Sequence, residues 1–322
     1  MAALNETVSA IKSLKIQGAS EVRKAAVLAI AQEAEKTNAK GIGEFRGKMR
    51  NAIRELYNSR PTEPELRAAM QALLHELAEA HESVAEAKRE LKKKCIEYEK
   101  DRESALKKIA EIGARKIEPG QTILVHCHSN SVMGILKKAK SMGKKFNVIC
   151  TESRPLLQGR ITARELCNAG IPVTMIVDSA VESAMHEADS FFSGADAVLA
   201  DGSVANKIGT ATISAIAKAH SVPHFVACSS QKFDPVTIMG KEEKIEERDW
   251  KEVWKEKPKK LLIRNPAFDI TNHSFVSEII SELGVHSPEA FALLMYGEMV
   301  WKGKDHMNAS VFRVAKSGKR SD

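Results

Sequence analysis

The sequence has few cysteines, few aromatic residues and no long apolar run. Its five cysteines are scattered, and no two of them form a Cys-x-x-Cys pair. This pattern argues against a disulfide framework and against a cysteine-based zinc site, and it favours reduced thiols in a cytoplasm. No stretch approaches the roughly 20 apolar residues that span a bilayer. The first residues also lack the basic and apolar regions of a secretory signal. We therefore expect a cytoplasmic protein without a membrane segment.

Aromatic residues make up only 5% of the 322 residues, which leaves little material for stacking on nucleic-acid bases. The formal net charge is +7, but lysines and arginines alternate with Glu and Asp along most of the chain. We therefore interpret the basic runs as solvated surface and expect no nucleic-acid partner. The positive excess is equally suited to attracting small polyanions such as sugar phosphates.

The N-terminal part of the chain is expected to form a helical bundle. Apolar residues recur there at helical spacing between charged ones, and Pro61 interrupts the pattern. The expected helices include Glu21–Glu35, Phe45–Tyr57, Glu65–Leu77 and Val84–Ala114. We assign this helical domain to residues 1–117.

From residue 118 onward, short apolar runs alternate with helical patterns. The expected strands are Thr122–Val125, Asn147–Cys150, Val173–Val177, Ala197–Leu199, His224–Ala227 and Lys260–Ile263. Strands that alternate with helices predict βαβ units. Residues 118–322 should therefore form a Rossmann-like α/β domain, a parallel sheet with helices on both faces. The Gly-x-Gly-x-x-Gly and P-loop motifs are absent, so no nucleotide cofactor is indicated.

The residues that follow the expected strands indicate the ligand site, because open α/β sheets bind ligands at the carboxyl edge of their strands. Cys127 follows the first strand, and Ser129, Asn130 and Ser131 are N-cap candidates for the next helix. Backbone N–H groups and a helix dipole at such a junction lower a thiol pKa. The alternative interpretation is a half-buried structural cysteine.

Three cations and several hydroxyls at the same edge suit a phosphorylated ligand, the cations being Arg154, Lys207 and Lys232. Taken singly, each lysine can also be an ordinary surface residue, and Asp196 can be a cap or turn residue. His126 and His128 alternate across a strand end, so they need not form a metal site.

Six segments, taken in chain order, resemble those of a known superfamily: His126–Ser129, Thr151–Pro155, Gly194–Asp196, Asn206–Thr210, Lys232–Phe233 and Arg264–Asp269. The superfamily unites archaeal ribose-1,5-bisphosphate isomerases, methylthioribose-1-phosphate isomerases and the regulatory subunits of the translation-initiation guanine-nucleotide exchange factor. The resemblance covers nearly the whole chain and is strongest to the ribose-1,5-bisphosphate isomerase branch.

The resemblance implies a two-residue mechanism. A protonated Asp196 opens the furanose ring of α-D-ribose 1,5-bisphosphate by donating to the ring oxygen. Cys127 takes the proton from C2, and an enolate-type intermediate gives ribulose 1,5-bisphosphate. The pKa of Asp196 is expected to be raised by its apolar neighbours in sequence, which are Phe191, Phe192, Val198 and Leu199.

By the same resemblance, two groups of residues hold the two phosphates. One group is Gln17, Gly18, Ala19 and Ser20 with Arg60, and the other is Asn206, Lys207 and Lys232, with His128 and Ser129 also at the substrate. Gln17 stands where the family's isomerases usually have arginine, and it cannot supply the bidentate charged contact. Arg23 or Lys24, about one turn further on, are candidates to compensate.

The resemblance also implies a setting for the activity. It predicts nucleoside monophosphate degradation, AMP as an activator, a dimer or hexamer, and no metal or organic cofactor. Two alternatives stay open: a regulatory subunit that binds a nucleotide or sugar phosphate without catalysis, and a related aldose-1-phosphate isomerase such as the methylthioribose enzyme. A purely regulatory subunit has no chemical reason to keep both Cys127 and Asp196.

Overall fold

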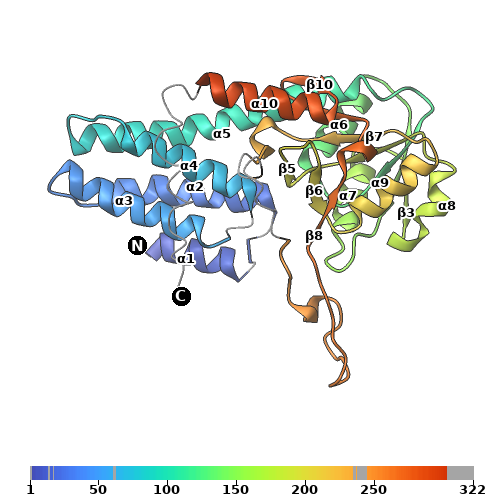
Figure 1. The fold of residues 1–322 in the computed structure, drawn as a ribbon, viewed down its shortest axis with the longest axis horizontal. Helices are drawn as coiled ribbons and strands as arrows, with labels where there is room; N and C mark the ends of the chain where they lie inside the picture. Colours follow the sequence, from blue (N-terminus) through green and yellow to red (C-terminus); the bar gives the residue numbers. More distant parts are fainter. Residues whose placement is uncertain are drawn as a thin grey trace, which may run out of the picture.

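The computed structural model describes residues 2–13, 15, 16, 18–60, 63–234, 237 and 245–302. Its N-terminal part is a bundle of five helices, seen at one end of the molecule in Figure 1: α1 (Ala2–Lys12), α2 (Ala19–Lys36), α3 (Ile42–Tyr57), α4 (Pro64–Ala78) and α5 (Val84–Ala114). Each helix contributes to one apolar core, for example through Ile11, Ile30, Phe45, Leu66 and Leu91. The helical periodicity of the sequence is confirmed in this half.

A seven-stranded sheet forms the centre of the other half. Its strand order is β10-β9-β7-β4-β1-β2-β3, and every pair is parallel except β9 with β10. The strands are β1 (Thr122–Val125), β2 (Asn147–Thr151), β3 (Val173–Ile176), β4 (Ser190–Ser193), β7 (His224–Ala227), β9 (Glu278–Ser281) and β10 (Gly284–His286). The predicted α/β class with a mostly parallel sheet is confirmed.

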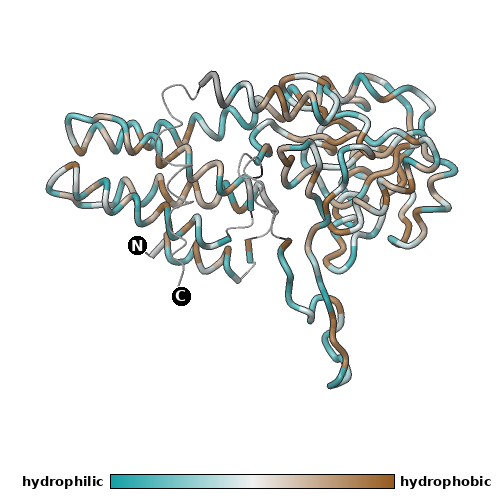
Figure 2. The backbone as a smooth tube through the Cα atoms, in the orientation of Figure 1, coloured by the Kyte–Doolittle hydropathy of each residue, from teal (hydrophilic) through white to brown (hydrophobic). Residues whose placement is uncertain are grey.

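Helices cover both faces of this sheet. On one face, α5, α6 (Asn130–Ser141) and α7 (Gln158–Asn168) pack against Ile123 and Val125 of β1. On the other face, α8 (Val181–Met185) and α9 (Thr210–Ala219) pack against Leu124. Side chains of β1 thus alternate between two cores, as a strand buried on both faces requires. Figure 2 shows the apolar residues gathered inside this half.

Two of the predicted strands differ from the prediction: one forms in another sheet, and one does not form. Ala197–Leu199 was expected in the main sheet, but that place is taken by β4, whose Ser190-Phe-Phe-Ser193 sequence has only two apolar residues. β5 (Ala197–Val198) instead joins β6 (Val204–Lys207) and β8 (Phe268–Thr271) in a separate antiparallel sheet. Residues 260–263 form no strand, because they belong to an exposed excursion in which the Leu262 side chain is 90% exposed.

The same excursion includes most of a charged segment between residues 241 and 260. Residues 241–244 lie outside the described part of the chain. From residue 245 to residue 267 the chain extends away from the body before returning into β8 (Figure 1). The base of this arm stays close to the helical half, since Glu246 accepts a hydrogen bond from Arg60 at 3.0 Å.

Helix α5 connects the two halves physically. Leu91 lies in the core of the bundle, whereas Ile109 lies in the core on one face of the sheet. The chain then passes from Ala114 to the start of β1 at Thr122. The domain division at residues 117 and 118 stays a prediction, because one rigid helix contributes to both cores. Within the described residues, no helix is long and apolar enough to cross a bilayer.

Candidate active site

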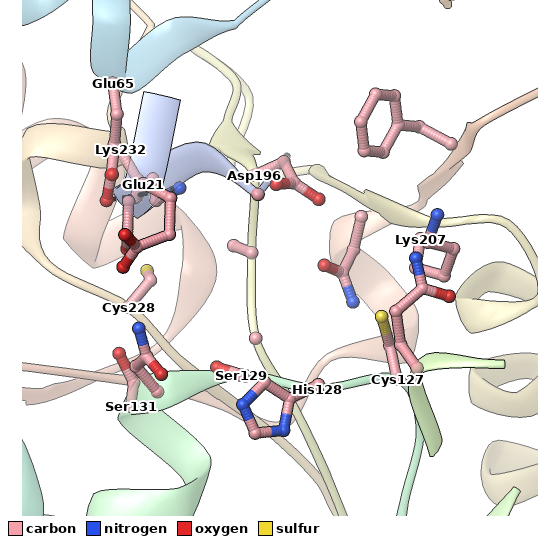
Figure 3. A pocket seen from close by; sticks show the side chains of 18 of the residues that line it. Glu21, Glu65, Cys127, His128, Ser129, Ser131, Asp196, Lys207, Cys228 and Lys232 are labelled. Atoms are coloured by element: carbon pink, nitrogen blue, oxygen red, sulfur yellow. Dashed lines mark ion pairs between the residues drawn. The ribbon is translucent and has the colours of Figure 1, made fainter. Parts of the chain in front are cut away.

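A cavity of about 450 Å³ lies at the carboxyl edge of the main sheet, and the start of α2 and the middle of α5 form part of its wall. Ten of the residues predicted from the sequence line this cavity: Gly18, Ser20, Arg60, Cys127, His128, Ser129, Asp196, Asn206, Lys207 and Lys232. Figure 3 shows Asp196 between Lys232 on one side and Lys207 with Cys127 on the other. The residues brought together are thus a thiol, a carboxyl group and cations on two sides.

Cys127 lies at the junction between β1 and α6 with a left-handed backbone, φ 64°. Its N–H donates to Ser153 Oγ at 2.8 Å, and its carbonyl accepts from Thr162 Oγ1 at 2.8 Å. Burial raises the pKa of the thiol to about 11, although Lys207 and the backbone N–H of His128 act in the opposite direction. The expectation that the junction lowers this pKa is wrong, because the desolvation of a buried thiolate outweighs the local dipoles.

The two histidines beside Cys127 have separate partners. His126 is buried, and its Nε2–H donates to the Ile208 carbonyl at 2.9 Å while Nδ1 accepts from Thr151 Oγ1 at 2.6 Å. Burial lowers the pKa of His126, so the ring is held neutral as a structural group. His128 faces the cavity, and its Nδ1–H donates to Thr162 Oγ1 at 3.0 Å.

Asp196 follows β4 through Gly194 and Ala195. Burial raises the pKa of its carboxyl group, while Lys232, Lys207 and Arg60 act to lower it. The prediction that this pKa is raised is confirmed. The charged neighbours that act on it are these cations, whereas Phe191 and Phe192 belong to the apolar cores on the two sheet faces. A raised pKa suits a carboxyl group that donates a proton.

Glycine is required at position 194, just before this carboxyl group. A Cβ there would lie 2.6 Å from Ser129 Oγ. The same hydroxyl caps α6 by accepting from the Val132 N–H at 3.5 Å, which confirms Ser129 as the predicted N-cap. The close approach of Gly194 therefore brings the end of β4 against the N-terminus of α6, within one wall of the cavity.

The structure separates two cations that the sequence grouped together. Lys207 lies beside Cys127 (Figure 3), and its Nζ is 5.8 Å from the centre of the Phe268 ring. Lys232 lies across the cavity and forms a buried ion pair with Glu65, Nζ to Oε1 3.3 Å. The assignment of Asn206, Lys207 and Lys232 to one phosphate stays a prediction.

Carboxylates and cations are interleaved on the Lys232 side. Arg60 is 3.0 Å from Glu246 and 3.8 Å from Glu63. Burial raises the pKa of Glu63 to about 8, aided by Asp196 and Glu65 and opposed by Lys232 and Arg60. For Glu65, burial acts upward, but Lys232, Arg102 and Arg23 together hold its pKa below the usual value.

The start of α2 also faces the cavity. Gly18, with φ 80°, precedes the helix, and Ser20 accepts a hydrogen bond from Arg102. Gln17 lies outside the described residues, and Ala19 is the first residue of α2. Arg23 does not line the cavity: it is fully buried and bonded to Glu99. The expected compensation by Arg23 is therefore wrong, and Arg102 is the guanidinium that stands beside this turn.

Lys24 and Arg154 also lie outside the cavity wall. Both are exposed, and Arg154 donates to the Val253 carbonyl at 2.9 Å instead of facing the ligand site. Sequence reasoning missed five charged lining residues, which are Glu21, Glu63, Glu65, Arg102 and Arg248. Arg102 cannot be singled out from the sequence, because it is one of many charged residues on α5. Glu63 and Glu65 could have been predicted, because they closely follow Arg60, which the resemblance assigns to the site.

This fold and cavity define an α/β protein whose ligand site, closed by a helical bundle, suits a small anionic molecule. The chain belongs to the initiation factor 2 subunit family, whose model matches residues 15–288. The family resemblance seen in the sequence is thereby confirmed.

Named relatives fall into three groups. The ribose 1,5-bisphosphate isomerase of Thermococcus kodakarensis is 38% identical over 305 residues, 92% of this chain and 94% of the relative. The methylthioribose-1-phosphate isomerase of Dehalococcoides mccartyi is 33% identical over 297 residues, 87% of this chain and 89% of the relative. The structure of a Pyrococcus horikoshii protein described as translation initiation factor eIF-2B matches with a TM-score of 0.78 and 29% identity, covering 89% of this chain and 98% of that one.

Proposed function

We propose that this protein is an isomerase that converts α-D-ribose 1,5-bisphosphate to D-ribulose 1,5-bisphosphate. The observation that carries the proposal is one cavity that brings Cys127 and Asp196 together, with cations on two sides of Asp196. Several relatives that are 38% identical over most of the chain bear the name of this activity, which supports the proposal.

Asp196 acts as the acid of the reaction. In its protonated form it donates to the ring oxygen as the bond from that oxygen to C1 breaks. Cys127, as the thiolate, removes the C2 proton, and the electrons of that C–H bond form a C1–C2 double bond. The resulting enol becomes the ketone when C1 gains a proton and the C2 hydroxyl loses one, so the conversion is an isomerisation with no net oxidation. Proton transfer by a positioned acid and base accelerates such steps by about 10²–10⁴-fold each.

The two phosphates are assigned to the two sides of Asp196. Lys207 and Asn206 hold one beside Cys127. Arg60, Arg102 and Lys232, with Gly18, Ala19 and Ser20 at the start of α2, hold the other, and His128 and Ser129 orient the sugar between them. Gln17 is assigned to the same phosphate as Gly18, as the family resemblance implies. We further infer a role in nucleoside monophosphate degradation with AMP as an activator, and an oligomer of two or six chains.

Two observations favour alternative functions. Similarity to methylthioribose-1-phosphate isomerases favours a monophosphate substrate, and the likeness to a protein described as eIF-2B favours a regulatory subunit that binds a ligand without turnover. The alternatives differ from the main proposal in the number of phosphates recognised and in whether Cys127 and Asp196 do chemistry.

The proposal is tested by incubating the protein with α-D-ribose 1,5-bisphosphate, with and without AMP, and following ribulose 1,5-bisphosphate. Cys127→Ser and Asp196→Asn should each lower kcat by about 10²-fold or more. Cys167→Ser is the matched control, because this thiol is exposed and outside the cavity, and it should keep full activity. Wild-type activity in both cavity variants would refute the residue roles, and no turnover by the parent protein would refute the function.

A further inference from the structure

A cluster of three potential metal ligands lies away from the cavity, along α8 and at the C-terminal end of α9. Glu182 is on α8, His186 follows its last residue, and His220 follows the last residue of α9. One donor atom from each side chain lies within 4.8 Å of the other two. His220 Nε2 is 2.9 Å from Glu182 Oε1, and the rings of His186 and His220 meet edge to face with centroids 4.8 Å apart.

The fold places these side chains together for simple reasons. Glu182 and His186 are four residues apart, so they project from the same side of one helical turn. α8 and α9 pack side by side on one face of the sheet, where Met185 and Ala217 share an apolar cluster. The C-terminal end of α9 thereby brings His220 to the α8 pair. Glu182 and His186 are exposed and His220 is partly buried, so an ion can enter from solvent.

We propose that Glu182, His186 and His220 form a binding site for a divalent transition-metal ion, with Zn²⁺ as the committed occupant. Imidazole nitrogen and carboxylate oxygen are ordinary zinc ligands at about 2.0–2.2 Å. Two donors on one tetrahedral ion are then roughly 3.3 Å apart, which is close to the 2.9 Å between His220 and Glu182. Rotation of exposed side chains supplies the remaining adjustment, and water takes the fourth position.

Another histidine–carboxylate contact in the protein shows what sets this cluster apart. His273 is 2.8 Å from Glu289, but this pair has a single histidine, and the described residues place no third donor within reach of the same ion. In the described part of the chain, only the α8–α9 cluster brings three histidine, cysteine or acidic donors within reach of one ion. No cysteine belongs to it, so thiol chemistry is not involved.

The location separates this site from the proposed reaction. His186 precedes β4 and His220 precedes β7, so both lie at the amino ends of these paired parallel strands. Asp196 and Lys232 follow the carboxyl ends of the same strands. A bound ion therefore cross-links the ends of α8 and α9 and stabilises the folded state by mass action. It takes no part in catalysis.

The test is calorimetric titration of Zn²⁺ into the full chain, after treatment with a chelator. Wild-type protein should bind one ion with an accompanying rise in Tm. His186→Gln and His220→Gln should each weaken that binding by about tenfold or more and remove the rise in Tm. His273→Gln is the matched control, since it removes an exposed histidine bonded to a glutamate, and it should bind as the wild type does.

Absorption of the Co²⁺-substituted protein identifies the ligand atoms independently. We expect a spectrum without a thiolate-to-cobalt band, as nitrogen and oxygen ligands give. The proposal is overturned if the wild type shows no saturable binding, if Zn²⁺ binds both histidine variants unchanged, or if a thiolate band accompanies the bound cobalt.

Discussion

At the residue scale, burial shifts the pKa values of Cys127 and Asp196 in the same direction, which favours the proposed role of Asp196 and opposes that of Cys127. It raises the pKa of both groups. A raised pKa keeps Asp196 protonated, as an acid must be, but it also keeps Cys127 protonated, which a base must not be. Of the groups that favour the thiolate, Lys207 has the largest effect. We therefore assign Lys207 two roles: it favours the thiolate form of Cys127, and it binds phosphate.

Replacing Lys207 should make Cys127 less reactive. Lys207→Met removes the charge that favours the thiolate, so the thiol pKa rises further and alkylation of Cys127 by iodoacetamide at pH 8–9 slows by up to about tenfold for one pKa unit. Peptide mass spectrometry measures Cys127 separately, with the exposed Cys167 as an internal reference. Lys207→Arg retains the charge and should react like the wild type. Equal rates in Lys207→Met and the wild type would contradict this role.

Glu63 should make ligand binding depend on pH. Its pKa is raised to about 8, so the side chain is neutral at pH 7 and ionises above pH 8. The new negative charge faces Asp196, Glu65, Lys232 and Arg60 and disfavours a phosphorylated ligand. We expect KM to rise above pH 8 in the wild type and to stay flat in Glu63→Gln, as steady-state kinetics over pH 7–9.5 would show. An identical rise in both proteins would exclude Glu63 as its source.

Cys127 could be placed at the sheet edge from the sequence because it follows an aliphatic strand, whereas Asp196 was singled out through the family resemblance. Both line the cavity, and their catalytic roles stay predictions. Arg102 was not found, because its helix carries charges on many positions and its contact with Ser20 spans 82 residues. The raised pKa of Cys127 was also missed, since burial depends on the bundle that covers the edge.

At the element scale, long helices and aliphatic strands were predicted best. The bounds of α5, β1 and β7 agree with the sequence prediction, because periodicity or β-branched runs mark them clearly. β4 was missed because serines occupy two of its four positions, although all four are buried. The Ser193 hydroxyl is satisfied by a tertiary contact, its hydrogen bond with His224, and such contacts have no local signal.

His224 should make the folded protein sensitive to acid. It lies on β7, where its ring contacts Ser193 Oγ of β4 and Ser214 Oγ of α9, each at 2.8 Å. Burial lowers its pKa to about 3, whereas the unfolded value is about 6.5. Between these values the unfolded chain binds the extra proton, so stability falls as pH drops below about 6.5, by about 1.4 kcal/mol per pH unit.

Urea unfolding at pH 7, 6 and 5 measures this dependence. His224→Gln keeps polar contacts but cannot titrate, so its stability should be lower at pH 7 and should lose less on acidification than that of the wild type. Parallel pH profiles for the two proteins would show that other groups control acid stability.

At the scale of the whole molecule, the helical half completes a cavity that the sheet alone leaves open. Arg67 of α4 is 2.7 Å from Asp234, and Arg60 is 3.0 Å from Glu246, so buried or partly buried ion pairs join the halves beside the site. The sequence predicted both halves but not this contact, because its partners are separated by 167 and 186 residues. The cations contributed by each half make the cavity suited to an anion at either end.

The most direct test compares kcat/KM for α-D-ribose 1,5-bisphosphate and 5-methylthioribose 1-phosphate in one preparation. Because charged hydrogen bonds are worth about 1.5–3 kcal/mol, cations on both sides of Asp196 should favour the bisphosphate by about 10²-fold. Arg102→Met should reduce that preference more than it reduces activity on the monophosphate. Turnover of the bisphosphate with this preference is the predicted result; equal or reversed preference, or no turnover of either compound, would contradict the account.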